Sequence, residues 1–208
     1  MVKFFKNRYV MIALIVTCLV GCSKAQRKND LEPLDLKGKK VLIVYLSRTN
    51  NTKAVANMIH KQVGGAIVGL EIKNPYPNDY RAIVDQVAKE NETDFLPELT
   101  TKIDSIRSFD VIFIGFPTWG MQLPPPIKSF LKQNDLKGKI VVPFNTNAGY
   151  GIGSTFDTVK ELCPQSKVLV GFTVKGGIER DGILFVMEGE KAVEVNTLIN
   201  QWLAKLEL

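Results

Sequence analysis

The stretch "KKVLIVYLSRTNNT", residues 39–52, passes directly from an apolar run into a polar loop. The run at 40–46, "KVLIVYL", is nearly continuous in apolar residues, which predicts a strand buried on both faces of a sheet. Residues 51–65 then place apolar side chains at helical spacing and end in Gly64-Gly65, a common helix C-terminus. A buried strand that leads through a short loop into a helix is how an α/β fold begins.

The same alternation continues to the C-terminus. Further continuous apolar runs predict strands at 66–72, 110–117, 139–146 and 167–174. The segments between and after them predict helices at 80–92, 125–133, 154–163 and 190–206. Five apolar strands that alternate with helices indicate the α/β class, a doubly wound parallel sheet with helices on both faces. Such sheets bind ligands at the carboxyl ends of their strands, so the loops there are the first place to look for a site.

Two of these helices have apolar residues spaced as on a helix that packs one face against a core. In the second helix these residues are Ile83, Val84, Val87 and Ala88. In the last helix they are Val195, Leu198, Ile199, Trp202 and Leu206.

The N-terminus differs in composition from the rest of the chain. Three basic residues between positions 3 and 8 precede an apolar run at 9–20, which is too short to cross a bilayer as a helix and is typical of an export signal. The four residues at 19–22, Leu19-Val20-Gly21-Cys22, overlap the end of this run and resemble the lipobox of bacterial lipoproteins. This resemblance implies that Cys22 is acylated and that the preceding peptide is removed. An uncleaved signal anchor is the alternative.

The predicted organisation is therefore a lipoprotein signal peptide at 1–21, a lipidated N-terminus and polar tether at 22–38, and one α/β domain at 39–208. Either interpretation of Cys22 gives an exported protein associated with a membrane. The protein would face the periplasm or the cell surface. Ser23 after the cysteine favours the outer membrane by the usual lipoprotein sorting rule, if the host has one.

Composition excludes several other classes of protein. Hydrophobic residues make up 45% and charged residues 23% of the chain, as in ordinary globular domains. Removal of residues 1–21 lowers the net charge from +6 to +3, so the basicity is weak evidence for nucleic-acid binding and none is expected. With Cys22 acylated, Cys163 is the one thiol left, and it is expected to be buried and structural. No metal-binding motif occurs, and the single histidine, His60, is expected at the surface.

The loop after the first strand is "SRTNNT", residues 47–52. A helix N-terminus presents open N–H groups and a partial positive charge, so it can hold a phosphate without lysine or arginine. The hydroxyls of Ser47, Thr49 and Thr52 could all turn toward one phosphate. An ordinary helix cap by Asn50, Asn51 or Thr52 is the alternative.

Two further loops end at the same predicted edge of the sheet. In "GFPTWG", residues 115–120, Trp119 lies between a proline-containing turn and a glycine, where it could stack on a flat aromatic ligand or cover the surface of the domain. In "NTNAGYGIGS", residues 145–154, glycines allow close approach of the backbone to a ligand, and Tyr150 could form a second aromatic wall. Each of these loops is ambiguous alone. One loop suited to a phosphate and two loops suited to a flat ring, all at one edge of the sheet, indicate a ligand site more specifically than any one of them.

The chain from about Lys39 to the C-terminus resembles the flavodoxin-like family, in particular a bacterial branch with the segments "GFPTWG...P...FL" and "GK...PF.T..G.G.G". The resemblance implies a parallel sheet of order 2-1-3-4-5 that binds flavin mononucleotide (FMN) non-covalently. It implies a phosphate loop formed by Ser47, Thr49, Asn50, Asn51 and Thr52, and Arg48 belongs to the same loop. The isoalloxazine ring would be flanked by Pro117, Thr118, Trp119 and Gly120 and closed on its other side by Thr146, Asn147, Ala148, Gly149, Tyr150 and Gly151.

The sequence departs from the family pattern at two positions. Asn50 stands where the usual phosphate loop has glycine, although asparagine tolerates a positive φ better than other residues with a side chain. Gly120 stands where many relatives have a second tryptophan, which is expected to affect ring affinity more than phosphate binding. The last strand, 167–174, is expected to run without the long insertion that splits it in some flavodoxins.

Three functions are compatible with these features. The first is a membrane-tethered FMN electron carrier whose redox partner is a protein or a quinone. The second, suggested by relatives with this fold, is an NAD(P)H-dependent FMN or quinone reductase. The third is a non-redox lipoprotein that kept the fold and lost the flavin. The sequence has no second Gly-rich dinucleotide fingerprint, which favours the carrier, and no catalytic residue is assigned.

Overall fold

The computed structural model describes Met1 and residues 36–206. The predicted signal peptide, the predicted lipidation site Cys22 and nearly all of the predicted tether lie outside the described residues. Within the described part of the chain, no helix combines the length and the apolar character needed to cross a membrane.

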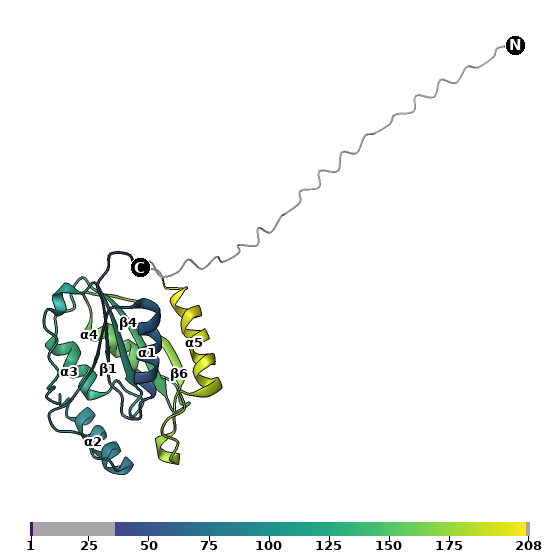
Figure 1. Cartoon of the computed structure of the whole chain (residues 1–208). Coiled ribbons are helices and arrows are strands. Elements are labelled where there is room, and N and C mark those ends of the chain that lie inside the picture. Colours follow the sequence, from purple (N-terminus) through teal and green to yellow (C-terminus); the bar gives the residue numbers. More distant parts are fainter. Residues whose placement is uncertain (2–35, 207–208) are drawn as a thin grey trace. The chain divides into compact units, whose positions relative to one another are not determined.

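A parallel sheet forms the centre of the domain, with strand order β2-β1-β3-β4-β5 and β6 also paired to β4 (Figure 1). The strands are β1 Val41–Tyr45, β2 Ala66–Gly69, β3 Val111–Pro117, β4 Ile140–Asn147, β5 Lys167–Val168 and β6 Phe172–Lys175. The middle strands β1, β3 and β4 are buried almost throughout, as their continuous apolar runs require. The predicted 2-1-3-4-5 order and the doubly wound parallel sheet are confirmed.

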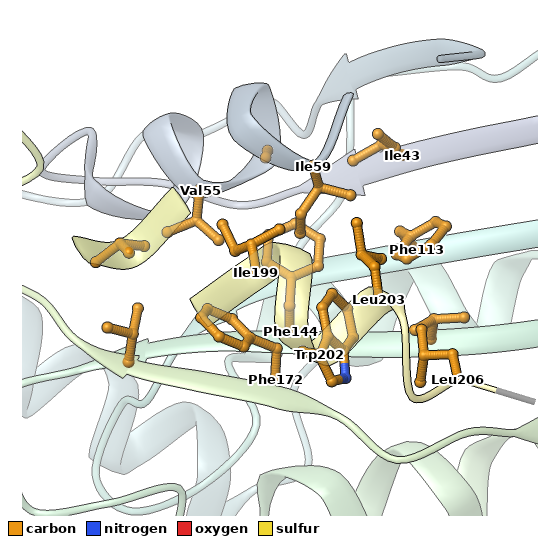
Figure 2. Close-up of a cluster of buried hydrophobic side chains, with 14 of the residues drawn as sticks. Ile43, Val55, Ile59, Phe113, Phe144, Phe172, Ile199, Trp202, Leu203 and Leu206 are labelled. Atoms are coloured by element: carbon orange, nitrogen blue, oxygen red, sulfur yellow. The ribbon is translucent and has the colours of Figure 1, made fainter. Parts of the chain in front are cut away.

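Helices cover both faces of this sheet (Figure 1). They are α1 Asn51–Val63, α2 Tyr80–Glu92, α3 Pro125–Gln133, α4 Thr155–Leu162 and α5 Gly189–Leu203, with short 3-10 turns at Ile106–Ser108 and Glu179–Asp181. One core cluster joins α1 and α5 to the sheet, and Figure 2 shows its aromatic centre of Phe113, Phe144, Phe172 and Trp202. The second cluster joins α3 and α4 to the opposite face. Cys163 is buried in that second cluster, as predicted.

The last strand position is interrupted, contrary to the expectation of one strand over 167–174. β5 ends at Val168 and β6 begins at Phe172. A Cβ added at Gly171 would lie 2.5 Å from the ring of Phe156, so the aromatic side chain of α4 packs directly on the backbone at this break. Leu169 still donates its N–H to the carbonyl oxygen of Val141 in β4 at 2.9 Å. The break is therefore short, and the long insertion is absent as predicted.

Two predicted apolar faces are only partly buried. In α5, Val195, Ile199 and Trp202 are buried, but Leu198 is 39% exposed at the edge of the contact. In α2, Ile83 and Val87 are buried, whereas Val84 is 45% exposed and Ala88 is also exposed. Helix α2 lies near the carboxyl ends of the strands (Figure 1), and its apolar face helps to line a cavity there.

Candidate functional site

A cavity of about 560 Å³ opens at the carboxyl edge of the sheet. Its walls are the loops after β1, β3, β4 and β6 together with one face of α2. Of the sixteen residues predicted from the sequence, those that line the cavity are Arg48, Thr49, Asn51, Thr52, Pro117, Thr118, Trp119, Gly120, Thr146, Asn147, Ala148, Tyr150 and Gly151. The lining does not include Ser47, Asn50 or Gly149. The three predicted loops thus meet at one place, although they are up to about a hundred residues apart in the chain.

The backbone of the loop after β1 turns sharply into α1. Asn50 has a φ of 65°, in the left-handed region, so asparagine occupies the conformation that glycine usually supplies. Its side chain makes no capping hydrogen bond. Instead, Ser47 Oγ accepts from the N–H of Lys53 at 3.2 Å, and the carbonyl oxygen of Asn50 accepts from the N–H of Ala54. Within the described residues, the N–H groups of Asn51 and Thr52 have no protein acceptor and remain open to a ligand.

The side chains of this loop are held by contacts with other loops. Asn51 Nδ2 donates to Thr49 Oγ1 at 2.8 Å and to the carbonyl oxygen of Leu184 at 2.6 Å. The hydroxyls of Thr52 and Thr146 share a hydrogen bond of 2.8 Å, which joins the loops after β1 and β4. The three hydroxyls predicted to gather around one point therefore differ in role, because Ser47 caps the helix while Thr49 and Thr52 line the cavity.

Trp119 is the first residue of a tight turn after β3. Its backbone pairs with that of Gln122 through two hydrogen bonds, and the turn is completed by positive φ values at Gly120 (55°) and Met121 (59°). The indole is half-buried, and the ring of Tyr76 contacts it edge to face at 5.2 Å between centroids. Trp119 is therefore held in place on the cavity wall by packing as well as by its turn.

Tyr76 is itself anchored to α2. Its hydroxyl donates to Glu90 Oε2 at 2.5 Å, and Gln86 Nε2 donates to the other carboxylate oxygen at 2.8 Å. These bonds satisfy Glu90, a carboxylate that is only 7% exposed. Burial, and then the bond to Glu90, raise the pKa of Tyr76 well above its usual value, so the phenol stays protonated and continues to donate. Helix α2, Tyr76 and Trp119 form one connected unit.

The loop after β4 is shaped by side-chain bonds to its own backbone. Asn147 Oδ1 accepts from the N–H groups of Gly149 at 2.8 Å and Gly151 at 3.3 Å. Thr118 Oγ1 donates to the carbonyl oxygen of Gly151 at 3.1 Å, which ties this loop to the Trp119 turn. Tyr150 is 65% exposed at the mouth of the cavity rather than forming a buried second wall.

Sequence reasoning missed two walls of the cavity. One is the segment 176–180, which follows β6 at the same edge of the sheet. The sequence carried a signal for it, because Gly176-Gly177 begins two positions after the end of the strand predicted at 167–174. In the structure, a Cβ at Gly176 would come within 3.3 Å of Asn51 Cβ. The other is the exposed apolar face of α2, which gave no such signal because a helical period does not tell what the face contacts.

Two arginines that line the cavity form ion pairs. Arg48 forms an ion pair with Glu179, and Arg180 forms one with Asp181 at 2.9 Å. The hydrogen bond from Arg180 lowers the pKa of Asp181 below its usual value. Across residues 36–206, no group of histidine, cysteine and carboxylate side chains is arranged to hold a metal ion. His60 lies at the other end of α1, half-buried, with Nε2 3.0 Å from the carbonyl oxygen of Gly65.

This arrangement can bind a ligand with two different ends. Open N–H groups at the start of a helix suit an anionic group, and a tryptophan on the wall of the same cavity suits a flat ring. Among the polar side chains of the lining, Asn51, Thr52 and Thr118 have hydrogen-bond partners within the protein. Arg48 has an ion-pair partner there.

Comparisons with known proteins agree with the geometry. The family model described as Flavodoxin matches residues 40–188. A protein assigned as a flavoprotein from Bacteroides eggerthii is 27% identical with a TM-score of 0.64, covering 79% of this chain and 96% of its own. Another so assigned, from Bacteroides uniformis, is 24% identical with a TM-score of 0.65, covering 79% of this chain and 97% of its own.

A flavoprotein from Lactobacillus acidophilus, solved in complex with FMN, is 25% identical with a TM-score of 0.57 and covers 70% of this chain and 98% of its own. No curated protein sequence matches the chain.

Proposed function

The chain belongs to the flavodoxin family, and from this premise we propose that it is an FMN-binding redox protein that transfers electrons while tethered to a membrane as a lipoprotein. FMN is the cofactor that the family and the Lactobacillus acidophilus flavoprotein support. When bound, FMN supplies the redox chemistry, and the protein binds and orients it and controls access to its ring.

The residues of the cavity fit FMN at both of its ends. The N–H groups of Asn51 and Thr52, at the positive end of α1, suit the phosphate. Trp119 and the backbone of the loop at 146–151 suit the isoalloxazine ring. The volume of about 560 Å³ falls within the range of about 300–1,000 Å³ that is usual for cofactor sites. The observation that carries the proposal is this pairing of a helix N-terminus and a tryptophan in one cavity.

The chain's own residues preset the shape of the site. Asn147 fixes the loop after β4 before any ligand arrives, because its side chain already holds two backbone N–H groups. Glu90 and Tyr76 fix Trp119 from the side of α2. Preset loops lower the conformational entropy lost on binding, which favours retention of a non-covalent cofactor.

Electron transfer is the role that the mouth of the cavity favours. Met121 is 45% and Tyr150 65% exposed there, so a partner could contact apolar side chains beside the ring. The sequence lacks a second dinucleotide-binding fingerprint, which makes exchange with a redox partner the simpler proposal. The partner would be a redox protein or a quinone.

A second candidate function is that of an NAD(P)H-dependent FMN or quinone reductase. The apolar face of α2 favours it, because Ile83, Val84 and Val87 extend the cavity beyond the phosphate and ring loops. Such a wall could contact a small flat substrate. Mixing the FMN-loaded protein with NADH or NADPH separates the two candidates, because only a reductase loses its visible absorption without another reductase present.

The membrane tether rests on the N-terminal sequence alone. The basic start, the short apolar run and Cys22 support acylation of that cysteine. The expected location is a membrane facing the periplasm or the cell surface, with the outer membrane favoured if the host has one. Radiolabelled palmitate should enter the wild-type protein in cells and should not enter the Cys22→Ser variant; equal labelling of both would contradict the lipoprotein assignment.

Reconstitution with FMN tests the proposed cofactor directly. Both core clusters lie within residues 36–206, so a chain of residues 23–208 retains the whole core. This chain should keep FMN after the excess is removed, and its visible spectrum should show the bands of protein-bound oxidised flavin. A colourless protein would exclude FMN binding and leave a lipoprotein that has the flavodoxin fold without the flavin.

A further inference from the structure

Arg48 is the one cation within the phosphate loop, and a direct contact with phosphate would be its expected use. The structure directs its guanidinium elsewhere. Nε lies 2.6 Å from Glu179 Oε1, one terminal nitrogen donates to the carbonyl oxygen of Pro77 at 2.8 Å, and the other donates to that of Asn78 at 2.7 Å. All three nitrogens of the group are therefore engaged by protein.

These bonds connect three segments that are distant in sequence. Arg48 follows β1, Pro77 and Asn78 precede α2, and Glu179 follows β6, with 131 positions between Arg48 and Glu179. The two side chains of the ion pair are only 18% and 22% exposed. Arg48, Glu179 and α2 all line the cavity, so the three segments that meet at Arg48 form one part of its wall.

We propose that Arg48 is a positioning residue that locks these three segments together and thereby slows the release of FMN, while the phosphate itself is held by backbone N–H groups. This inference rests on the proposed FMN binding. The Arg48–Glu179 pair is called the clamp below. Release of FMN requires part of the cavity wall to move, and the clamp resists that movement.

Charge supports the same division of roles. Glu179 balances the charge of Arg48 across a short contact, so little net attraction for a phosphate remains on the pair. If Arg48 turned to a phosphate, the Glu179 carboxylate would be left without its partner inside the cavity wall, and the carbonyl groups of residues 77 and 78 would lose their donors. The cost of these losses favours the clamp.

The Glu179→Gln variant distinguishes a clamp from a phosphate ligand by the sign of its effect. Dissociation rates of FMN and of riboflavin, which lacks the phosphate, are measured by stopped-flow fluorescence on the full chain in detergent. For a clamp, both rates should rise by the same factor, about threefold or more, because a charge-assisted bond is lost. If Arg48 binds the phosphate, the freed arginine should slow FMN release and leave riboflavin unchanged, which would overturn the proposal.

A matched control removes a carboxylate of the same kind elsewhere. Glu98 pairs with Lys73 at 2.8 Å, but the two side chains are 66% and 57% exposed and do not line the cavity. Glu98→Gln should leave both dissociation rates within error of wild type. A rise in this variant equal to that in Glu179→Gln would also overturn the proposal.

Amide hydrogen exchange tests the clamp without any flavin. Segments 76–82 and 176–186 should exchange faster in Glu179→Gln than in wild type, with no change in Glu98→Gln. Unchanged exchange in both segments would contradict the clamp. A wild-type protein that retains no FMN but shows this exchange pattern would contradict the proposed function and leave the clamp standing.

Discussion

Asn50 occupies a backbone conformation that most residues avoid. Its φ of 65° lies in the left-handed region, which costs an ordinary L-residue roughly 1–2 kcal/mol and asparagine less. Asn50→Ala should therefore lower the free energy of unfolding by about 1 kcal/mol, whereas Asn50→Gly should leave it within about 0.5 kcal/mol of wild type. Urea denaturation of the three proteins measures both changes. An alanine variant as stable as wild type would show that the strain is absent.

Trp119 provides the test of the ring wall at the same scale. Removal of an aromatic stack costs about 1 kcal/mol or somewhat more beyond the lost area, so Trp119→Ala should weaken FMN binding at least about fivefold. Fluorescence titration of FMN measures the dissociation constant. Trp119→Phe keeps a ring in contact with Tyr76 and is the matched control, with a smaller loss expected.

Riboflavin gives a second readout for the same variants. A stacking residue contacts the ring and not the phosphate, so Trp119→Ala should weaken riboflavin and FMN by similar factors. A loss confined to FMN would show that the tryptophan acts on the phosphate loop, and an unchanged dissociation constant for both ligands would remove Trp119 from the site.

In helix α5, two consecutive apolar residues differ in whether they belong to the core or to the surface. Ile199 is fully buried in the core cluster that also contains Phe113 and Trp202 (Figure 2), while its neighbour Leu198 is 39% exposed. Ile199→Ala should lower the free energy of unfolding by about 2–5 kcal/mol, because it leaves a cavity in a packed core. Leu198→Ala should lower it by less than about 1 kcal/mol.

Chemical denaturation of this pair checks the assignment of the α5 face. The two variants lose the same number of carbon atoms from adjacent positions, so the change in side-chain size is matched. Equal destabilisation would mean that Leu198 is also part of the core. The spacing of apolar residues alone places both on one face, and only the width of the contact with the sheet separates them.

Helix α2 illustrates a different limit at the scale of elements. Its bounds, 80–92, agree with the sequence prediction because caps and apolar spacing are local properties. The partner of its apolar face is not local. Val84 and Ala88 are exposed beside the cavity because α2 packs at the carboxyl edge of the sheet rather than fully upon it. Amphipathic spacing predicts that a face will be covered but does not predict what covers it.

Across the whole molecule, the features that could be predicted are those encoded by the pattern of residues close together in the sequence. Buried strands appear as apolar runs, and the parallel order brings the loops after β1, β3 and β4 to one edge, as expected for this fold. The contacts of Arg48 depend on a residue 131 positions away, so its place in the loop after β1 does not reveal them. The loop after β6 was overlooked although its glycine pair follows the same rule as the other loops. The N-terminal predictions stay untested, since those residues are not described.

Cys163 reports on the cohesion of the whole domain. It is 4% exposed at the end of α4, and burial raises the pKa of its thiol to about 11. Because the reactive form is the thiolate, the raised pKa alone should slow the reaction with Ellman's reagent at pH 8 about a hundredfold relative to an exposed thiol. In residues 23–208 Cys163 is the sole cysteine, so the measured rate belongs to it.

The contribution of the Cys163 thiol to stability depends on pH with a definite sign. The folded-state pKa lies above that of the unfolded chain, so burial of the neutral thiol stabilises the fold below the unfolded value, and this stabilisation is lost as the pH rises through about 11. Native protein at pH 8 should react slowly, and urea should accelerate the reaction in step with global unfolding. A Cys163→Ala protein carrying Glu161→Cys, an exposed thiol on the same helix, should react fast without urea. Fast reaction of native Cys163 would mean that α4 opens locally, independently of the rest of the core.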